Sequence, residues 1–246
     1  MLQISDIKGD LHNHTDFIEG ENTVLEMIAK ARALGYSYYS YCDHAPSVSA
    51  RGEEEVQRII NERRGFVDKF NLEHPTFKLF LGFEVNILAV GGLAWPNELL
   101  SQLDFVVASV HNNLKDPKEK MTTRIISALE NPYVSILGHP TCRLVSSRPP
   151  SEVDWDAVFK VAARGGKIME INANPERLDL PEDLVKVAKG FDLKFVISSD
   201  AHSVPEQDLM SYGLEVAQRA GLAASSVVNT WNYEMLKDYL KEIKRR

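Results

Sequence analysis

Residues 105–111 read FVVASVH, and this stretch decides the fold class. From Phe105 to Val110 the side chains are apolar or small at both odd and even positions, and His111 follows directly. Successive side chains of a strand point to opposite faces, so such a run is typical of a strand buried on both faces. Residues 195–199, FVISS, repeat the pattern and end at Asp200. Both runs indicate a parallel sheet that is covered by helices.

Segments of strand and helix character alternate along the rest of the chain. We expect strands at 4–12, 36–42, 77–85, 104–110, 134–138, 167–172 and 194–199. We expect helices at 23–34, 53–73, 119–130, 154–165, 182–189, 206–220 and 232–244. Seven such units in 246 residues fit one domain, residues 1–246, with an α/β barrel close to (β/α)₇. A doubly wound open sheet is the alternative, and in either fold ligand sites lie at the carboxyl ends of the strands.

Metal-competent side chains stand where the predicted strands emerge into loops. They are His12, His14, Glu84, His111, His139, Asp200 and His202. A His-x-His pair on a strand end puts both imidazoles on one face, because side chains repeat every two residues. Mixed imidazole and carboxylate ligands suit Zn²⁺, Mn²⁺ or Fe²⁺ rather than Ca²⁺ or Mg²⁺. The sequence therefore predicts a polynuclear metal site on the rim of the barrel, with His74 outside it at the surface.

The charge balance limits the partners. A net charge of −7 argues against an extended nucleic-acid surface, which needs a basic stripe. A phosphate group can still bind where metal ions supply the positive charge. Two cysteines make no disulfide framework, residues 1–20 lack a signal-peptide pattern, and no apolar run reaches membrane-spanning length. We therefore expect a cytoplasmic protein with no membrane partner.

Six short motifs carry a resemblance to a known family. They are GDLHNHT (9–15), CDH (42–44), GFEVNI (82–87), SVHNN (109–113), LGHP (137–140) and SSDAHS (198–203). In this order, over residues 8–231, they resemble the PHP (polymerase and histidinol phosphatase) superfamily. Further stretches, such as EINANPERLDL (170–180), are similar to the C-terminal PHP domain of bacterial and archaeal family X DNA polymerases. The sequence contains no polymerase segment, so we expect a free-standing relative.

The resemblance implies a distorted (β/α)₇ TIM-like barrel that holds three divalent metal ions, Zn, Mn or Fe, at the carboxyl ends of its strands. Carried over by motif, the ligands would form three sets: His12, His14, Glu84 and Asp200; Glu84, His111 and His139; and Glu19, His44 and His202. Glu84 would bridge the first two sets. Glu19 is the one departure, because the polymerase relatives usually have Asp at this position and some phosphatases have His.

The resemblance also implies the chemistry, which is hydrolysis of phosphate mono- or diesters by a metal-bound hydroxide. Water on a divalent ion has its pKa lowered to about 7. Three divalent ions, three carboxylates and one hydroxide would leave about two positive charges in the cleft, which attract a phosphoryl group. We expect the residues that take part in catalysis to be Glu84, Asp200, His202 and Arg143. Arg143 and Arg177 are candidates for bidentate contact with the substrate phosphate, and Asp10 and Asp43 for orienting neighbouring imidazoles.

Two substrate classes compete, and we favour a broad phosphoesterase that can act on nucleotide or DNA ends, with a small-molecule phosphatase as the alternative. The resemblance to family X polymerases favours a 3′–5′ exonuclease or 3′-phosphatase acting on nucleotide or DNA ends. The acidic charge favours a small-molecule phosphatase such as histidinol phosphatase. Two other hypotheses are a non-catalytic metal-binding scaffold and a metal-dependent hydrolase of C–N bonds. The nearly complete ligand set argues against the first, and the lack of a lysine at a matching strand end argues against the second.

Overall fold

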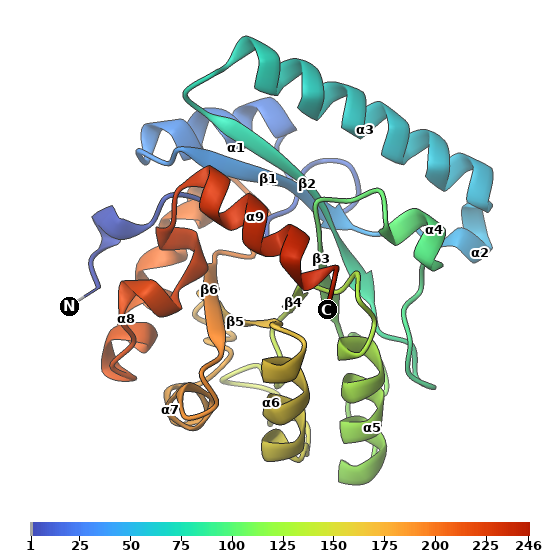
Figure 1. Cartoon of the computed structure of the whole chain (residues 1–246), viewed down its shortest axis with the longest axis vertical. Helices are drawn as coiled ribbons and strands as arrows, with labels where there is room; N and C mark the ends of the chain where they lie inside the picture. Colours follow the sequence, from blue (N-terminus) through green and yellow to red (C-terminus); the bar gives the residue numbers. More distant parts are fainter. Residues whose placement is uncertain (1) are drawn as a thin grey trace.

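The computed structural model describes residues 2–246, and a curled parallel sheet lies at its centre (Figure 1). Within these residues the sheet has six strands. They are β1 (Tyr38–His44), β2 (Lys78–Asn86), β3 (Phe105–Ser109), β4 (Ile136–Leu137), β5 (Ile168–Asn172) and β6 (Lys194–Ser198). All neighbours pair in parallel, and the strands follow one another in sequence order. A doubly wound sheet would reverse its order part-way, so the barrel-like alternative is the one observed.

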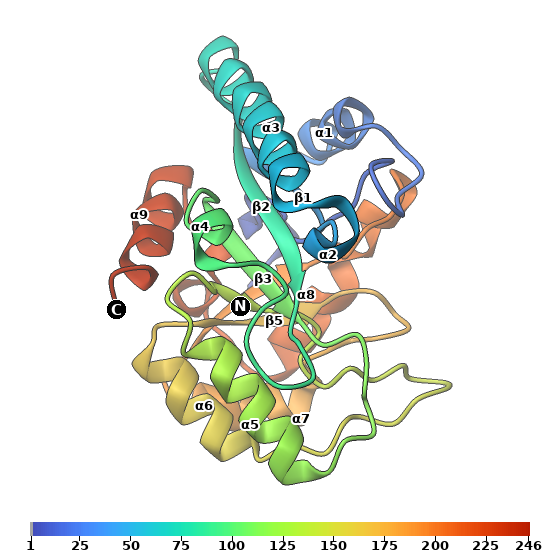
Figure 2. The same cartoon turned by 90° about the vertical axis from the view of Figure 1, so that its right-hand side faces the viewer.

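Helices surround this sheet (Figure 2). They are α1 (Val24–Ala33), α2 (Val48–Arg51), α3 (Glu53–Glu73), α4 (Asn97–Leu100), α5 (Lys118–Leu129), α6 (Trp155–Arg164), α7 (Glu182–Lys189), α8 (Met210–Arg219) and α9 (Tyr233–Ile243). Short 3₁₀ turns occur at Ile4–Asp6, Pro205–Leu209, Ala224–Ser226 and Val228–Thr230. Thr23 and Glu26 form a capping box that begins α1. None of the helices in the described part is long and apolar enough to cross a membrane.

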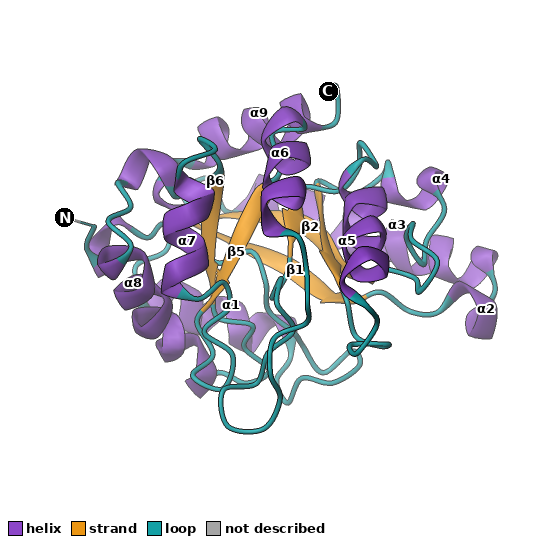
Figure 3. Ribbon diagram, turned by 90° about the horizontal axis from the view of Figure 1, so that it is seen from below, coloured by secondary structure: helices purple, strands orange, loops and turns teal. Residues whose placement is uncertain are grey.

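Two apolar cores lie on the two faces of the sheet. The larger one fills the space between the strands and the surrounding helices. The smaller one lies inside the curl, where Phe80, Phe105 and Val196 meet Leu236 and Leu240 of α9. Figure 3 shows α9 at one end of the strands and long loops at the other end. The terminal helix therefore covers one opening of the curl, and the loops at the opposite end are left to form a site.

The N-terminal segment differs from the expected strand at 4–12. Residues 4–6 form a 3₁₀ turn, and only Asn13 makes a bridge, which is parallel and pairs with Ala201. The backbone of Lys8 nevertheless accepts bonds from Ser37 and Tyr38 beside β1. The segment lies between the two edge strands of the sheet, but its hydrogen bonds are too scattered to form a continuous ladder.

Candidate metal centre and active site

The carboxyl ends of the strands bring Glu84 to the middle of a histidine cluster. His44 and Glu84 are direct partners in the β1–β2 register, so their side chains lie on the same face. Glu84 Oε2 is 2.7 Å from His44 Nδ1, 3.4 Å from His12 Nε2 and 3.8 Å from His14 Nε2. Glu84 Oε1 is 2.9 Å from His139 Nε2 and 3.2 Å from His111 Nε2. One buried carboxylate thus faces five imidazoles, two on one oxygen and three on the other.

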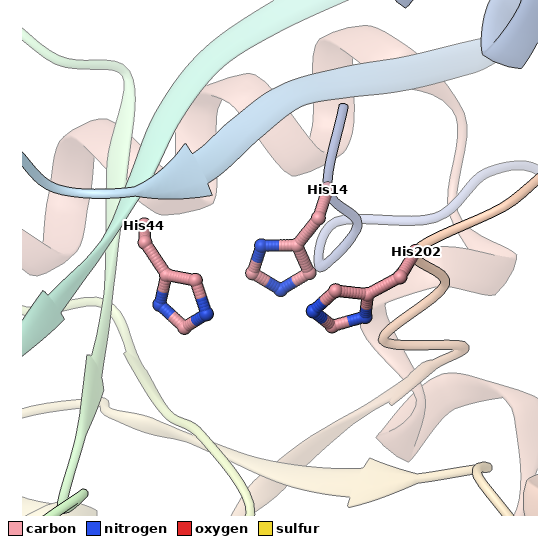
Figure 4. Close-up of side chains that lie close together, drawn as sticks. All are labelled: His14, His44 and His202. Atoms are coloured by element: carbon pink, nitrogen blue, oxygen red, sulfur yellow. The ribbon is translucent and has the colours of Figure 1, made fainter. Parts of the chain in front are cut away.

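The described residues contain four groups of potential metal ligands, and within each group the ligand atoms lie within 4.8 Å of one another. They are His12–His14–Asp200, His12–Glu84–His139, His44–Glu84–His111 and His14–His44–His202. Figure 4 shows the imidazoles of the last group converging from the N-terminal segment, from the end of β1 and from the loop after β6. The structure therefore brings together eight of the nine residues expected to hold metal. They are distributed over overlapping groups that share His12, His14, His44 and Glu84.

Glu19, the ninth expected ligand, lies at the edge of this cluster. Its Oε2 is 3.2 Å from His44 Nε2, and its side chain is 60% exposed. His202 lies on the other side of this part of the cluster, where its ring stacks on that of His14 with centroids 4.1 Å apart. The Nδ1–H of His202 donates to the backbone carbonyl of Asp200 at 2.9 Å, which leaves Nε2 as the nitrogen with a free lone pair.

Glu170 is a residue of the site that the sequence analysis did not identify. It is fully buried in β5, and its Oε1 lies 2.7 Å from His12 Nδ1. Its Oε2 accepts a hydrogen bond from the backbone N–H of His139 at 2.5 Å. A carboxylate on the far nitrogen of an imidazole is the usual outer partner of a metal-ligating histidine. The signal in the sequence was a glutamate inside the otherwise apolar run IMEIN, at residues 168–172.

The charges inside the cluster shift several pKa values. Burial lowers the pKa of His12, but the carboxylates of Glu170, Asp200 and Glu84 outweigh burial and hold it well above its ordinary value. Burial raises the pKa of Glu84 and of Asp200, and the neighbouring histidines more than reverse this, so that both carboxyls have pKa values well below the usual range. Both carboxylates therefore carry charge at neutral pH and need a positive partner.

Asp10 and Asp43 do not orient imidazoles, contrary to the expectation. Asp10 accepts from the backbone N–H of His12 and from the hydroxyl of Ser199. Asp43 accepts from the backbone N–H of Thr15 at 2.5 Å. Both side chains fix backbone segments that carry predicted ligands. Burial raises the pKa of Asp10 to about 7, against hydrogen bonds that lower it.

Two of the predicted ligands have unusual backbone conformations. The φ angle is +24° at His139 and +54° at Asp200. Left-handed conformations are sparse for residues other than glycine and cluster at functional sites. The surroundings hold the strain in place, because Asp200 N donates to His12 O and Asn172 Nδ2 donates to Asp200 Oδ2, both at 2.9 Å.

An open pocket of about 590 Å³ lies in front of the cluster. Arg177 lines this pocket, and its Nε is 3.3 Å from Asp200 Oδ2. Arg143 is not among the lining residues, because its guanidinium donates to the backbone carbonyls of Arg177 and Leu178. The geometry gives Arg143 the task of holding the backbone of Arg177, and direct contact of Arg143 with substrate stays a prediction. Arg51, which the sequence analysis did not single out, also lines the pocket.

The histidine–carboxylate cluster lies at the carboxyl ends of the strands, which is where barrel enzymes have their active sites. The PHP domain model matches residues 10–174, and the chain belongs to the PHP domain family. This confirms the family that the six motifs predicted.

Similar proteins fall into two kinds. The DNA polymerase/3′-5′ exonuclease PolX of Bacillus subtilis (strain 168) is 30% identical over 98% of this chain, which spans 42% of that protein. A probable phosphatase of Thermoanaerobacter sp. (strain X514) is also 30% identical, over 96% of both proteins. Histidinol phosphate phosphatase of Lactococcus lactis subsp. lactis Il1403, solved with zinc, L-histidinol and phosphate, has a TM-score of 0.62 at 16% identity, covering 88% of this chain and 94% of that one. The prediction of a PHP-type phosphoester-hydrolysing enzyme agrees with these relatives.

Proposed function

We propose that this chain is a metal-dependent phosphoesterase. One observation carries the proposal. Glu170 accepts the Nδ1–H of His12, which leaves a lone pair on Nε2. That buried nitrogen has no hydrogen-bond partner among the described residues, and it faces carboxylate oxygens of Glu84 at 3.4 Å and Asp200 at 3.6 Å. This nitrogen and the two carboxylates need a positive charge between them. In the metal-free chain a proton on His12 meets that need, and a divalent ion bound by the same atoms can take the place of the proton.

The donor set fits such ions. Imidazole nitrogens and carboxylate oxygens are the ligands that Zn²⁺, Mn²⁺ and Fe²⁺ accept. We assign three ions to nine residues, namely His12, His14, Glu19, His44, Glu84, His111, His139, Asp200 and His202. The histidine side chains are also oriented in advance, because His12, His111 and His202 each place Nδ1 against a protein oxygen. That leaves Nε2 of each ring toward the cluster.

Divalent ions bound there would lower the pKa of a coordinated water and offset the charge that develops on a phosphoryl group. The protein side chains then divide the remaining tasks. Glu84 and Asp200 hold the positive charge in place, and His202 lies beside them with a free Nε2. Arg177 donates to a phosphate oxygen from the pocket wall, and Arg143 keeps the backbone of Arg177 fixed.

We infer a phosphorylated small molecule as the substrate class. The pocket is of small-molecule size, and Phe17, Ile18 and Pro46 give one wall an apolar character that suits a carbon-rich leaving group. The relatives of similar length are probable phosphatases, which supports this choice. A nucleic-acid 3′ end is the second candidate, because the similarity to a polymerase/exonuclease extends over 98% of the chain.

We propose as well that residues 1–246 form one domain and that residues 7–14 take the place of the seventh strand in a distorted (β/α)₇ barrel. The support is the pair of contacts on either side of this segment, to Tyr38 beside β1 and to Ala201 after β6. A cytoplasmic location stays a prediction.

The test is a substrate panel with Mn²⁺-loaded protein. It contains p-nitrophenyl phosphate, histidinol phosphate, a dinucleotide, and 3′-labelled single- and double-stranded DNA. His111→Ala should lose at least about 100-fold in turnover with its fold retained, whereas His74→Ala, outside the cluster, should match the wild type. Metal analysis should give close to three ions per chain. Hydrolysis of none of the substrates by metal-loaded protein would refute the esterase proposal, and unchanged turnover in His111→Ala would refute the assignment of the site.

A further inference from the structure

Arg63 is a buried cation on α3 that the proposed reaction does not use. Only 4% of the residue is exposed. Its guanidinium carbon lies over three aromatic rings, 4.0 Å from the centroid of Tyr41, 4.1 Å from Phe17 and 4.5 Å from Phe83. Its Nη2 is 2.8 Å from Asp43 Oδ2. A planar guanidinium can stack on several rings and pair with a carboxylate at once, which an ammonium group cannot do.

Two partners of Arg63 connect it to the loop 15–20, which carries Glu19: Phe17 lies in the loop, and Asp43 of β1 binds it. Asp43 holds the start of this loop, because it accepts from the backbone N–H and the hydroxyl of Thr15. Phe17, two residues further, rests on the guanidinium and also lines the pocket. The N–H of Gly20 returns to the carbonyl of Thr15 at 2.9 Å and closes the loop. A Cβ at Gly20 would lie 2.6 Å from backbone atoms of Thr15, so the closed shape requires glycine there.

The same partners reach the histidine cluster through β1. Asp43 and Phe83 form a register pair on the face of the sheet toward α3, and the next pair, His44 and Glu84, points into the cluster. Arg63 therefore contacts both the loop that carries Glu19, through Phe17, and the strand that carries His44, through Asp43. Backbone hydrogen bonds from Asp16 to Asn22 and from Glu21 to His202 hold the base of the loop. The tip, Ile18 and Glu19, is exposed, so Phe17 on the guanidinium is its anchor toward β1.

We propose that Arg63 is a positioning residue that holds the loop 15–20 against β1, so that Glu19 and His44 can share one metal ion and Phe17 can form a wall of the substrate pocket. The proposal rests on the proposed function for the identity of the ion. If Arg63 served stability alone, its removal would lower the free energy of unfolding of the whole chain. It would have no selective effect on this loop or on this ion.

The first experiment does not depend on metal or on activity. Hydrogen exchange is measured on the metal-free chain for Arg63→Met, and for Arg64→Met as the matched control. Arg64 is the next residue of α3 and pairs with Asp104, away from the loop. In Arg63→Met we expect the amides of residues 15–20 to exchange about tenfold faster, and in Arg64→Met we expect wild-type exchange there. Equal exchange of these amides in wild type and Arg63→Met overturns the proposal. If Arg63→Met does not fold, Arg63→Lys carries the same test with the same outcomes.

The second experiment concerns the metal. In Arg63→Met we expect one ion per chain to bind at least about tenfold more weakly, with the others unchanged. A double-mutant cycle with Glu19→Gln then tests the route, because residues that act through one another are non-additive. If Arg63 acts through Glu19, Arg63→Met has no further effect on that ion in the Glu19→Gln background, and fully additive losses overturn the proposal. Absence of phosphoesterase activity in the wild type would refute the proposed function but leave the exchange result standing.

Discussion

At the scale of single residues, Glu170 shows how a buried carboxylate prepares a ligand. Its carboxylate is the hydrogen-bond partner of His12 Nδ1 and also accepts from the backbone N–H of His139. In Glu170→Gln the negative charge is lost, so His12 becomes a weaker base and a weaker ligand. We expect metal affinity to fall by about 10–100-fold, measured by competition with a chelator. Glu176→Gln, an exposed neighbour in sequence, is the control, and equal affinity in Glu170→Gln and the wild type would contradict this role.

Asp179 allows a prediction about pH that is separate from the metal cluster. It is fully buried and accepts from the backbone N–H of Thr141 at 2.9 Å. Burial raises the pKa of Asp179 to about 7 from an ordinary value of 3.8, against the hydrogen bonds from Thr141, which lower it. Between these two pH values the folded chain binds more protons than the unfolded chain, so this group lowers stability as pH rises from about 4 to about 7.

Asp179→Asn removes that ionisation. The free energy of unfolding of the variant minus that of the wild type should therefore increase between pH 4 and pH 8, by an amount on the order of 1 kcal/mol or more. Urea unfolding of metal-free protein at a series of pH values measures this. Asp238→Asn, an exposed substitution on α9, should show no such trend, and a flat difference for Asp179→Asn would show that the carboxyl titrates normally.

At the scale of elements, the sequence predicted most helices and strands because their signals are local. The helix expected at 53–73 has the observed bounds, and the apolar runs at 104–110 and 194–199 contain β3 and β6. The segment 4–12 does not form a regular strand because its hydrogen bonds go to scattered partners, Asn229, Ser37 and Tyr38, and make no continuous ladder. The run 134–138 gave only the two-residue strand β4, although it is buried throughout.

The site followed the same division between local and long-range information. The strand-end histidines could be found because each is marked by a buried run before it. Glu170 was missed because its partner, His12, is 158 residues away. Arg143 was assigned to the substrate because it lies close to His139 in sequence. In the structure Cys142, the residue before it, has a left-handed backbone, and the guanidinium of Arg143 donates to the carbonyls of Arg177 and Leu178.

The helix α9 makes a prediction at this scale. Leu240 is 1% exposed and packs in the inner core with Leu236, Ile243 and residues of the strands. Leu240→Ala should lower the free energy of unfolding by about 2–5 kcal/mol, because it removes buried surface and leaves a cavity. Lys241→Ala, on the exposed side of the same helix, should change it by less than about 0.5 kcal/mol. A loss below about 1 kcal/mol for Leu240→Ala, measured by urea unfolding, would mean that the inner core does not depend on α9.

At the scale of the whole molecule, the cluster concentrates charge that the fold alone does not neutralise. Glu84 and Asp200 are 1% and 4% exposed and have pKa values held well below the usual range by the surrounding histidines, against burial, which raises them. In the metal-free chain protonated His12 supplies part of the compensating charge, because the carboxylates raise its pKa against burial, and Arg177 beside Asp200 supplies another part. The contribution of His12 to stability is complete below the unfolded pKa of about 6.5 and is lost as pH rises through the higher folded value.

Metal removal should therefore destabilise the chain most at alkaline pH. As pH rises through the raised pKa of His12, its positive charge is lost, and the two carboxylates depend more on divalent ions. At pH 6 protons perform part of this task and compete with the ions. A ligand present at 100 times its Kd stabilises the folded state by about 2.7 kcal/mol per site. We expect the fall in Tm caused by a chelator to be larger at pH 8.5 than at pH 6, and to be reversed by added Mn²⁺.

His74→Ala should respond as the wild type does, because His74 stacks on Phe70 outside the cluster. His12→Ala should lose most of the difference between the two pH values, and an equal fall in Tm at both in the wild type would show that the ions do not bind where His12 faces Glu84 and Asp200.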